Sequence, residues 1–329
     1  MIAGLASNRI LSLDLGRGAV RVLASDIVSD GIVAFDPPTL RLFAIHRAPD
    51  ASRALIALDV RSGQRLWVAP ASAFPGLLMA RVLRSSFDGS AVVACPVSVD
   101  SSIGVLVLDA ATGARRNFVA DVTCSGAVSA LPDGRFLLAG RRTPGSTLSD
   151  SLFLLDADRG AIVDAFRMSP GLQQVGSLSP LGDGSRVLVG GDATLLRYNL
   201  VFRSIEVAIQ RRSPGELTVS GPAESVLLSD PGTGFDFPSS GLIREYDASL
   251  RSVRELDLRA FGTNGVPPTM GAARVTPDGA FVVLGAGTPP RGPLYGVQPA
   301  RVLVLDTRTG RLVRAIDLGD WGTPLAFPY

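Results

Sequence analysis

Few residues of this chain are of the types that make or break bonds in active sites. Histidine occurs once, as His46, which leaves no His₂ or His₃ ligand set for a catalytic zinc ion. A lone histidine can still act as a general base. Without a partner of matching type in the sequence, we expect His46 to have a structural or surface role.

Other catalytic patterns are also missing from the sequence. There is no GxSxG motif and no Ser/His/Asp order to support nucleophilic hydrolysis. Two carboxylates stand close together in DPGTGFD, at Asp230 and Asp236, but the oxygen ligands are too few and the spacing differs from a calcium loop. We therefore expect neither a metal nor a cofactor.

The two cysteines, Cys95 and Cys124, permit two interpretations. Cys95 is predicted at the end of a strand and Cys124 in a connection that follows, with both on one face, so that a disulfide is within reach. A disulfide would indicate an oxidising compartment. Alternatively, each is a small buried hydrophobic residue of a cytoplasmic protein. We favour a secreted or periplasmic location over a cytoplasmic one, with a leader absent from this chain.

All 32 basic residues are arginine, because the sequence contains no lysine, and 30 acidic residues bring the net charge to +2. Arginine suits bidentate binding of carboxylates and phosphates, although a codon bias would produce the same composition. The arginines are spread evenly among the acidic residues, which argues against a nucleic-acid groove. No apolar run approaches the ~18 residues that a membrane span needs.

A repeated phrase supplies the framework for these residues. An apolar run ends in Asp or Asn (the anchor), a turn follows with glycine four residues later, and a second apolar run begins. Asp opens a turn by accepting a bond from its own backbone, and glycine takes the positive φ that closes it. Only Arg203 and Arg251 replace the glycine. The seven anchors are Asp14, Asp59, Asp109, Asp156, Asn199, Asp247 and Asp306.

A second hairpin precedes most anchors, as in GAVSALPDGRFLLAG (126–140) and GAARVTPDGAFVVLGAG (271–287). Each unit then carries four antiparallel strands, and such units of roughly 40–50 residues, repeated radially, predict an all-β, seven-bladed β-propeller. We expect a single domain over residues 1–329. The closing blade combines 1–24 with the C-terminal strand 322–329, and the other blades span approximately 31–72, 77–120, 126–168, 176–210, 215–258 and 271–318.

The LDxxTG phrase with its SPDG-like turns resembles the YVTN family of seven-bladed propellers, which is related to YncE-like and lactonase-like proteins. The copy ALDVRSGQRLW, with Asp59, Gly63 and Trp67, also resembles the tryptophan-docking repeat of quinoprotein and BamB-like propellers. The other six copies lack that tryptophan, and Asn117 stands at the matching position of the next copy.

The long connections of unequal length are predicted on one face, and we expect a binding site there. The leading hypothesis is a non-catalytic, monomeric scaffold that binds a protein, peptide or surface glycan. The alternatives are a lactonase-like or lyase-like enzyme using Asp, Glu and Arg, and a quinoprotein-like redox subunit suggested by Trp67. The candidate binding residues are Arg141, Arg142, Arg211, Arg212, Asp230, Asp236, Phe237, Phe261, Arg291, Tyr295 and Trp321.

Overall fold

The computed structural model shows a chain built from antiparallel β-strands, with one short 3-10 segment, η3 (Arg259–Phe261), among the described residues. No helix among the described residues has the length and apolar character needed to cross a bilayer. The structure describes residues 2–6, 9–25, 33–36, 38–47, 53–70, 80–96, 104–120, 122–141, 151–168, 175–191, 194–210, 217–219, 226–229, 241–261, 269–276, 278–287 and 301–318.

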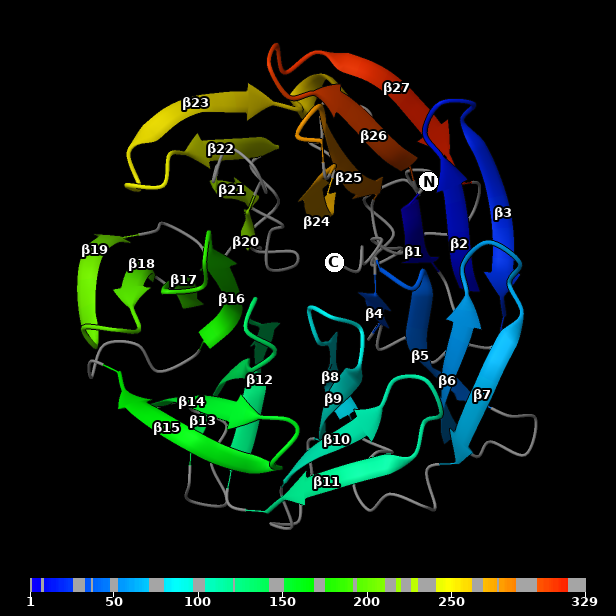
Figure 1. The fold of residues 1–329 in the computed structure, drawn as a ribbon. Coiled ribbons are helices and arrows are strands. Elements are labelled where there is room, and N and C mark those ends of the chain that lie inside the picture. The colour runs from blue at the N-terminus through cyan, green and yellow to red at the C-terminus, as the bar shows by residue number, and fades with distance from the viewer. Residues whose placement is uncertain are drawn as a thin grey trace, which may run out of the picture. The chain divides into compact units, whose positions relative to one another are not determined.

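The described strands form one three-stranded sheet and six four-stranded sheets, and within each sheet the strands lie side by side in chain order (Figure 1). The first sheet is β1 (Ile2–Ala6), β2 (Arg9–Asp14) and β3 (Ala19–Ala24). The second is β4 (Val33–Asp36), β5 (Arg41–Arg47), β6 (Arg53–Asp59) and β7 (Arg65–Pro70). The third is β8 (Ala80–Ser85), β9 (Ala91–Pro96), β10 (Val105–Asp109) and β11 (Arg115–Val119).

The remaining sheets repeat the same order. The fourth is β12 (Thr123–Ala130), β13 (Phe136–Arg141), β14 (Ser151–Asp156) and β15 (Ala161–Arg167). The fifth is β16 (Val175–Leu181), β17 (Arg186–Gly191), β18 (Thr194–Asn199) and β19 (Ser204–Gln210). The sixth is β20 (Leu217–Val219), β21 (Val226–Ser229), β22 (Leu242–Tyr246) and β23 (Ser252–Asp257). The seventh is β24 (Thr269–Val275), β25 (Phe281–Gly287), β26 (Arg301–Asp306) and β27 (Leu312–Asp317).

The chain divides into two compact units, and the division runs through the fifth sheet. Unit 1 comprises residues 1–22, 193–197 and 205–327, and unit 2 comprises residues 23–192, 198–204 and 328–329. In unit 2, the second and third sheets share one apolar cluster, and the third and fourth sheets share another. In unit 1, the sixth and seventh sheets share a cluster, and Leu11 and Leu13 of β2 pack with Val283, Val302 and Val304 of the seventh sheet.

In four of the sheets the third strand is buried on both faces. Four consecutive residues of β6, β10, β14 and β26 are buried, whereas the fourth strands β7, β11 and β27 are exposed along most of their length. Apolar sheets on either side cover the third strand, so its sequence does not alternate between apolar and polar residues. Burial on both faces therefore explains why the apolar runs before the anchors are continuous.

The anchor turns form as the sequence predicts. At the second sheet, the Asp59 carboxylate accepts a hydrogen bond from the backbone N–H of Ser62 (2.7 Å), and the N–H of Gly63 donates to the Asp59 carbonyl oxygen (2.8 Å). Gly63 has a φ of 77°, which a residue with a Cβ rarely adopts. Asp109 and Asp306 accept equivalent bonds from Thr112 and Thr309.

Cys95 of β9 and Cys124 of β12 form a disulfide that joins the third sheet to the fourth. Their Cα atoms are 5.8 Å apart, and both residues are buried. The predicted position of Cys124 in a connection is wrong, because β12 begins at Thr123 and places the cysteine inside the strand. The disulfide therefore links two strands directly.

Candidate functional site

Each sheet presents two edges of different character. In the six four-stranded sheets, the antiparallel order places the anchor turns and the turns between first and second strands together, at one end of the strands. We call this end of each sheet the turn edge. The connections from second to third strands, and those that leave the fourth strands, begin at the opposite end of the strands, which we call the connection edge.

Two of the predicted binding residues, Arg141 and Phe261, lie in the described part of the chain. The other nine lie outside the described residues: Arg142, Arg211, Arg212, Asp230, Asp236, Phe237, Arg291, Tyr295 and Trp321.

Arg141 is the last residue of β13 and pairs with Thr123 of β12. The prediction placed it in a loop, but the strand continues through it, because the ladder with β12 extends to this position. Its side chain is half-buried, and its buried Nε has no hydrogen-bond partner among the described residues. Buried N–H groups are nearly always paired, so this one is an available donor at the connection edge for a carboxylate, phosphate or carbonyl group.

Phe261 has a structural role that the sequence did not predict. It ends η3, where its N–H donates to the Leu258 carbonyl oxygen (2.9 Å). Its ring packs against the apolar cluster of the sixth and seventh sheets, which contains Leu256, Leu258 and Leu284. Phe261 therefore contributes to the core of unit 1, and its role in binding stays a prediction.

His46 lies in β5, half-buried and opposite Ala54 of β6. Among the described residues, no group of three or more His, Cys, Asp or Glu side chains is placed to hold a metal ion.

Two ion pairs at the connection edge of unit 1 were not singled out from the sequence. Asp257, at the end of β23, accepts hydrogen bonds from the Arg259 side chain, including one of 2.9 Å from Nε, and this holds the pKa of Asp257 at about 2. Arg301 donates to Asp317 across β26 and β27 (2.7 Å). Asp257 and Arg259 are two residues apart, and Arg301 and Asp317 lie on neighbouring strands, so both pairs are local in the sequence. The sequence alone does not show which Arg pairs with which Asp.

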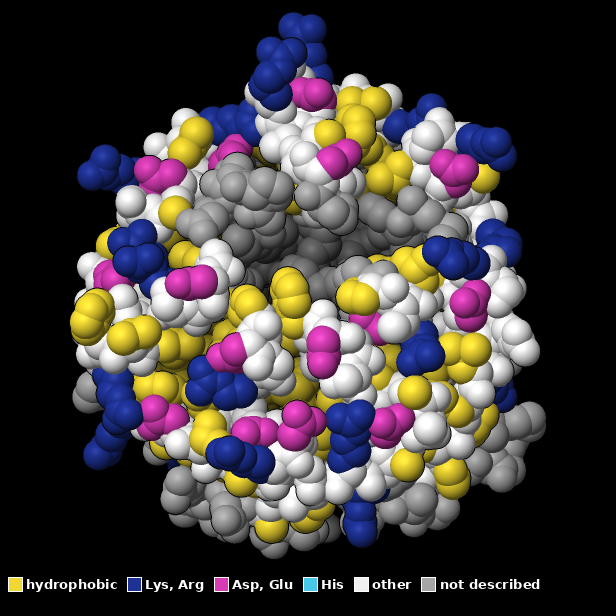
Figure 2. All heavy atoms as spheres, viewed as in Figure 1, with side chains coloured by type: hydrophobic (Ala, Val, Ile, Leu, Met, Phe, Trp, Pro, Cys, Tyr) yellow, Lys and Arg dark blue, Asp and Glu magenta, His cyan; other side chains and the backbone are white. Residues whose placement is uncertain are grey.

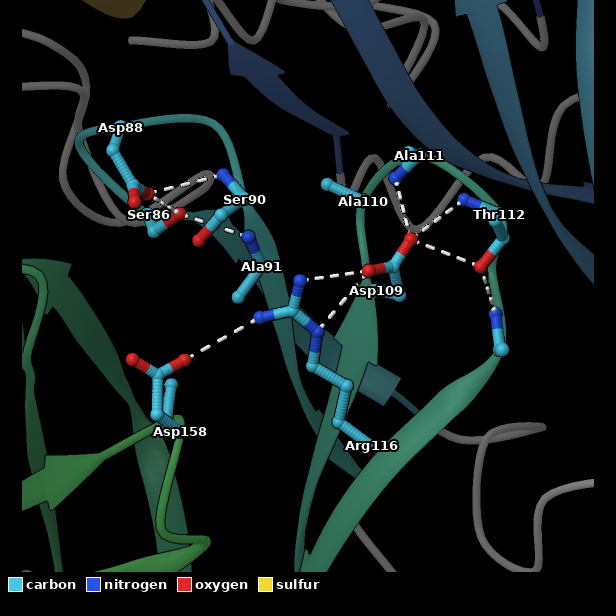
Figure 3. A network of polar contacts seen from close by, with 12 residues as sticks. Ser86, Asp88, Ser90, Ala91, Asp109, Ala110, Ala111, Thr112, Arg116 and Asp158 are labelled. Carbon is cyan, nitrogen blue, oxygen red and sulfur yellow. Dashed lines mark hydrogen bonds and ion pairs between the residues drawn. The ribbon is translucent and has the colours of Figure 1, made fainter.

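At the turn edge, one arginine connects two consecutive sheets of unit 2 (Figure 3). Arg116 of β11 donates to Asp109 of its own sheet (2.7 Å) and forms an ion pair with Asp158 of the next sheet (3.5 Å). The hydrogen bond from Arg116 lowers the pKa of Asp109 to about 2. These ion pairs join the two sheets, and the Asp109 carboxylate is held ionised.

Trp67 also joins two sheets. Its indole Nε1 donates to the Ala110 carbonyl oxygen in the anchor turn of the third sheet (3.1 Å), and its ring packs near Phe43, with the ring centroids 5.8 Å apart. Asn117 does the same for the next pair of sheets, since its Nδ2 donates to the Ala157 carbonyl oxygen (3.0 Å). The contact made by Trp67, which resembles tryptophan docking, is therefore one of several equivalent contacts between sheets, and the side chain that makes the contact differs from one to the next.

Charges on the surface are mixed. Figure 2 shows arginine and carboxylate side chains interspersed among polar and apolar ones over the described part of this face. This agrees with the even spread of charge in the sequence.

Solved structures match the fold of this chain. BamB from Moraxella catarrhalis superimposes with a TM-score of 0.56 at 15% identity, covering 100% of this chain and 91% of that one. The fold is a β-propeller.

Two further propeller structures match as well. The β-propeller domain of Cps50 (Swd1) from Myceliophteria thermophila has a TM-score of 0.63 at 14% identity, covering 86% of this chain and 88% of its own. A candidate 6-phosphogluconolactonase from Bacteroides fragilis has a TM-score of 0.62 at 13% identity, covering 100% and 98%. No family model matches the chain, and no curated protein matches it. At these identities the likeness concerns the fold alone.

Proposed function

We propose that this β-propeller is a non-catalytic scaffold that binds a protein, a peptide or a surface glycan at the connection edge of its sheets. The observation that carries the proposal is the difference between the two edges. The anchor turns are short and closed by their own hydrogen bonds. The connections at the other edge range from residues 192–193 between β17 and β18 to residues 288–300 between β25 and β26. Variable loops on a rigid frame are the usual place for recognition.

The charged groups of the described residues favour binding over catalysis. A general acid in a hydrolytic or lyase reaction needs a carboxyl with a raised pKa. Asp109 and Asp257 both have pKa values lowered to about 2, each first of all by hydrogen bonds from an arginine side chain. Such carboxylates remain ionised and act as acceptors. A redox role is not needed to explain Trp67, because its indole is engaged between two sheets.

The proposed architecture is a single domain over residues 1–329 with seven blades of the YVTN type, one for each described sheet. The first sheet has three strands among the described residues, and its β2 packs against the seventh sheet. We propose that residues 322–329 supply the missing first strand of this sheet, beside β1. A ring closed in this way has no sheet edge that needs a partner, which favours a monomer.

The experiment is capture of ligands from a peptide library and a glycan array by the purified chain and by two variants with shortened connections. One variant replaces residues 231–239 with a short Gly-Ser linker, and the other replaces residues 289–299. Phe202→Ser is the matched control, because this side chain is 78% exposed at the turn edge. Loss of captured ligands in the loop variants alone supports the proposal. Equal capture by all of the proteins removes the site from the connection edge.

A separate assay distinguishes the enzymatic alternative. The chain is incubated with sugar lactones, including 6-phosphogluconolactone, and hydrolysis is followed by proton release. Turnover that disappears in the loop variants would replace binding with catalysis as the function of this edge.

A further inference from the structure

One structural position recurs in five of the sheets and faces the next sheet in each of them. It lies on the fourth strand, opposite the residue two before the anchor. In the pairing register, Trp67 faces Ala57 and Asn117 faces Val107. Asp164 faces Leu154, Arg254 faces Glu245 and Arg314 faces Val304. The five residues at this position are of four types, since Arg254 and Arg314 are both arginine.

Three of these side chains reach a backbone carbonyl in the anchor turn of the following sheet. The acceptor is the residue directly after the anchor: Ala110 for Trp67, Ala157 for Asn117 and Thr307 for Arg254. In the fifth sheet the donor comes from the third strand, since Arg197, held by Glu206 at 2.8 Å, donates to the equivalent carbonyl of Ala248. A turn carbonyl that would otherwise face solvent is thereby satisfied across the junction.

At three junctions the glycine four residues after the anchor makes room for the side chain of the neighbouring sheet, whereas at Gly310 the side chain that fills this space is Leu256. A Cβ added at Gly113 would lie 2.7 Å from the Trp67 ring, and one added at Gly160 would overlap the Asn117 side chain. Gly18 holds the Arg314 guanidinium in the same way, with Nη1 2.9 Å from the position of a Cβ. These glycines are required twice, for their positive φ and for the neighbour's side chain.

The fourth sheet departs from this pattern both in its docking side chain and in the turn that this side chain meets. It carries Asp164, which cannot donate to a carbonyl, and the turn that it meets carries Arg203 in place of glycine. The guanidinium of Arg203 donates to the Asp164 carboxylate (2.9 Å) and lies over the Phe166 ring, 5.4 Å from its centroid. At this junction the docking side chain is the acceptor and the turn supplies the donor. At the junctions of Trp67, Asn117 and Arg254, the side chain is the donor and a turn carbonyl is the acceptor.

We propose that this position is a docking position, in which the side chain of one sheet and the anchor turn of the next are matched pair by pair, so that each junction is selective for its own neighbour. Exchanging the partners would place a carboxylate against a carbonyl oxygen, or an indole against a turn filled by arginine. Both arrangements are repulsive or overlapping. In a chain of similar sheets, this selectivity opposes the pairing of sheets out of order.

The first test separates docking from backbone strain. Gly113→Ala and Gly279→Ala replace glycines with nearly equal φ values, 73° and 71°, but no atom of the described residues lies within 4 Å of a Cβ at Gly279. Thermal unfolding is measured for both variants, alone and combined with Trp67→Ala. We expect Gly113→Ala to lower the midpoint by roughly 2–6 °C more than Gly279→Ala, and this excess to vanish in the Trp67→Ala background. Equal effects of the two glycine variants in the otherwise unchanged chain would overturn the docking of Trp67, and so would an excess that persists without Trp67.

The second test recodes one junction into another. Asp164→Asn and Arg203→Gly together convert the fourth junction into the type formed by Asn117 and Gly160. Each single variant should lower the unfolding midpoint by about 1–2 °C, because the ion pair is partly exposed. The double variant should recover most of that loss. If the two losses simply add, the side chain and the turn are not matched, and the proposed selectivity is wrong.

Discussion

At the level of single residues, the anchor carboxylates Asp14, Asp59, Asp109 and Asp306 each accept hydrogen bonds within their own turn. Asp109 accepts bonds from the N–H and hydroxyl of Thr112 and from two nitrogens of Arg116. Each bond favours the charged form, so the pKa of Asp109 falls to about 2, chiefly through the bond from Arg116. Charge on this carboxylate is therefore linked to folding.

Asp109→Asn should make unfolding less dependent on acid. A folded pKa below the unfolded one stabilises the protein above the unfolded pKa of about 3.8, and this contribution disappears as the pH falls toward 2. We expect the variant to lose about 1 kcal/mol of unfolding free energy at pH 7, after allowing for solvent screening, and to show a shallower decline between pH 4 and pH 2. Urea unfolding at pH 7, 4, 3 and 2.5 measures this. Asp158→Asn is the control, since its side chain is 88% exposed. Parallel pH curves for Asp109→Asn and the unchanged chain would contradict the assignment.

The two anchor turns without glycine show what the sequence pattern can and cannot predict about turn conformation. Arg203 replaces the glycine and adopts the positive φ itself, at 55°. In the turn after Asp247, Leu250 rather than Arg251 has the positive φ, at 59°, and its N–H bonds to the Asp247 carbonyl oxygen. That turn is one residue tighter than the others. The sequence shows that the rule is broken at both positions, but the closing hydrogen bond decides which residue adopts the left-handed conformation.

At the level of elements, the disulfide joins two strands that no hydrogen-bond ladder connects. Cys95 and Cys124 are 29 residues apart in sequence, and β9 and β12 belong to different sheets. The bond therefore restricts the unfolded chain and fixes one junction in the folded chain.

Removing the disulfide should weaken the junction between the third and fourth sheets. For a loop of this length, the chain-entropy model gives about 3–4 kcal/mol of stabilisation. We expect Cys95→Ala with Cys124→Ala to lower the unfolding free energy by roughly that amount, and reduction of the unchanged chain to lower it similarly. Guanidinium unfolding with and without a reductant measures both, and non-reducing mass spectrometry counts free thiols. Two free thiols in the protein isolated from an oxidising compartment would rule out the bond.

Elements were more predictable than the contacts between them. The Asp-to-Gly phrase indicates strand, turn and strand because those residues act on their own backbone, as at Asp59 and Gly63. The junctions depend on residues in different sheets, so Asn117 carried no signal until its carbonyl partner was known. The candidate site was the least predictable part. Arg141 belongs to a strand and Phe261 to the core, since ladder pairing and apolar packing extend beyond the limits that loop composition suggests.

At the level of the whole molecule, the first and last sheets of the described chain share a core. Leu11 and Leu13 of β2 pack with Val302, Val304 and Ile316 of the seventh sheet, although nearly 300 residues of sequence separate them. The Arg314 guanidinium beside Gly18 extends this junction to the turn edge. Contacts of such long range form late and depend on the sheets between them.

Deletion of residues 323–329 should destabilise the whole propeller, because the proposed first strand of the first sheet is lost and the free side of β1 is left unpaired. We expect the thermal midpoint to fall by several degrees and the protein to aggregate more readily, both measured by light scattering during a thermal scan. Adding the synthetic peptide GTPLAFPY in excess should restore part of the midpoint by occupying the vacant position, whereas a scrambled peptide should not. A truncated chain that unfolds at the same temperature as the intact one would show that the tail does not complete the first sheet, and the closed seven-bladed ring would have to be abandoned.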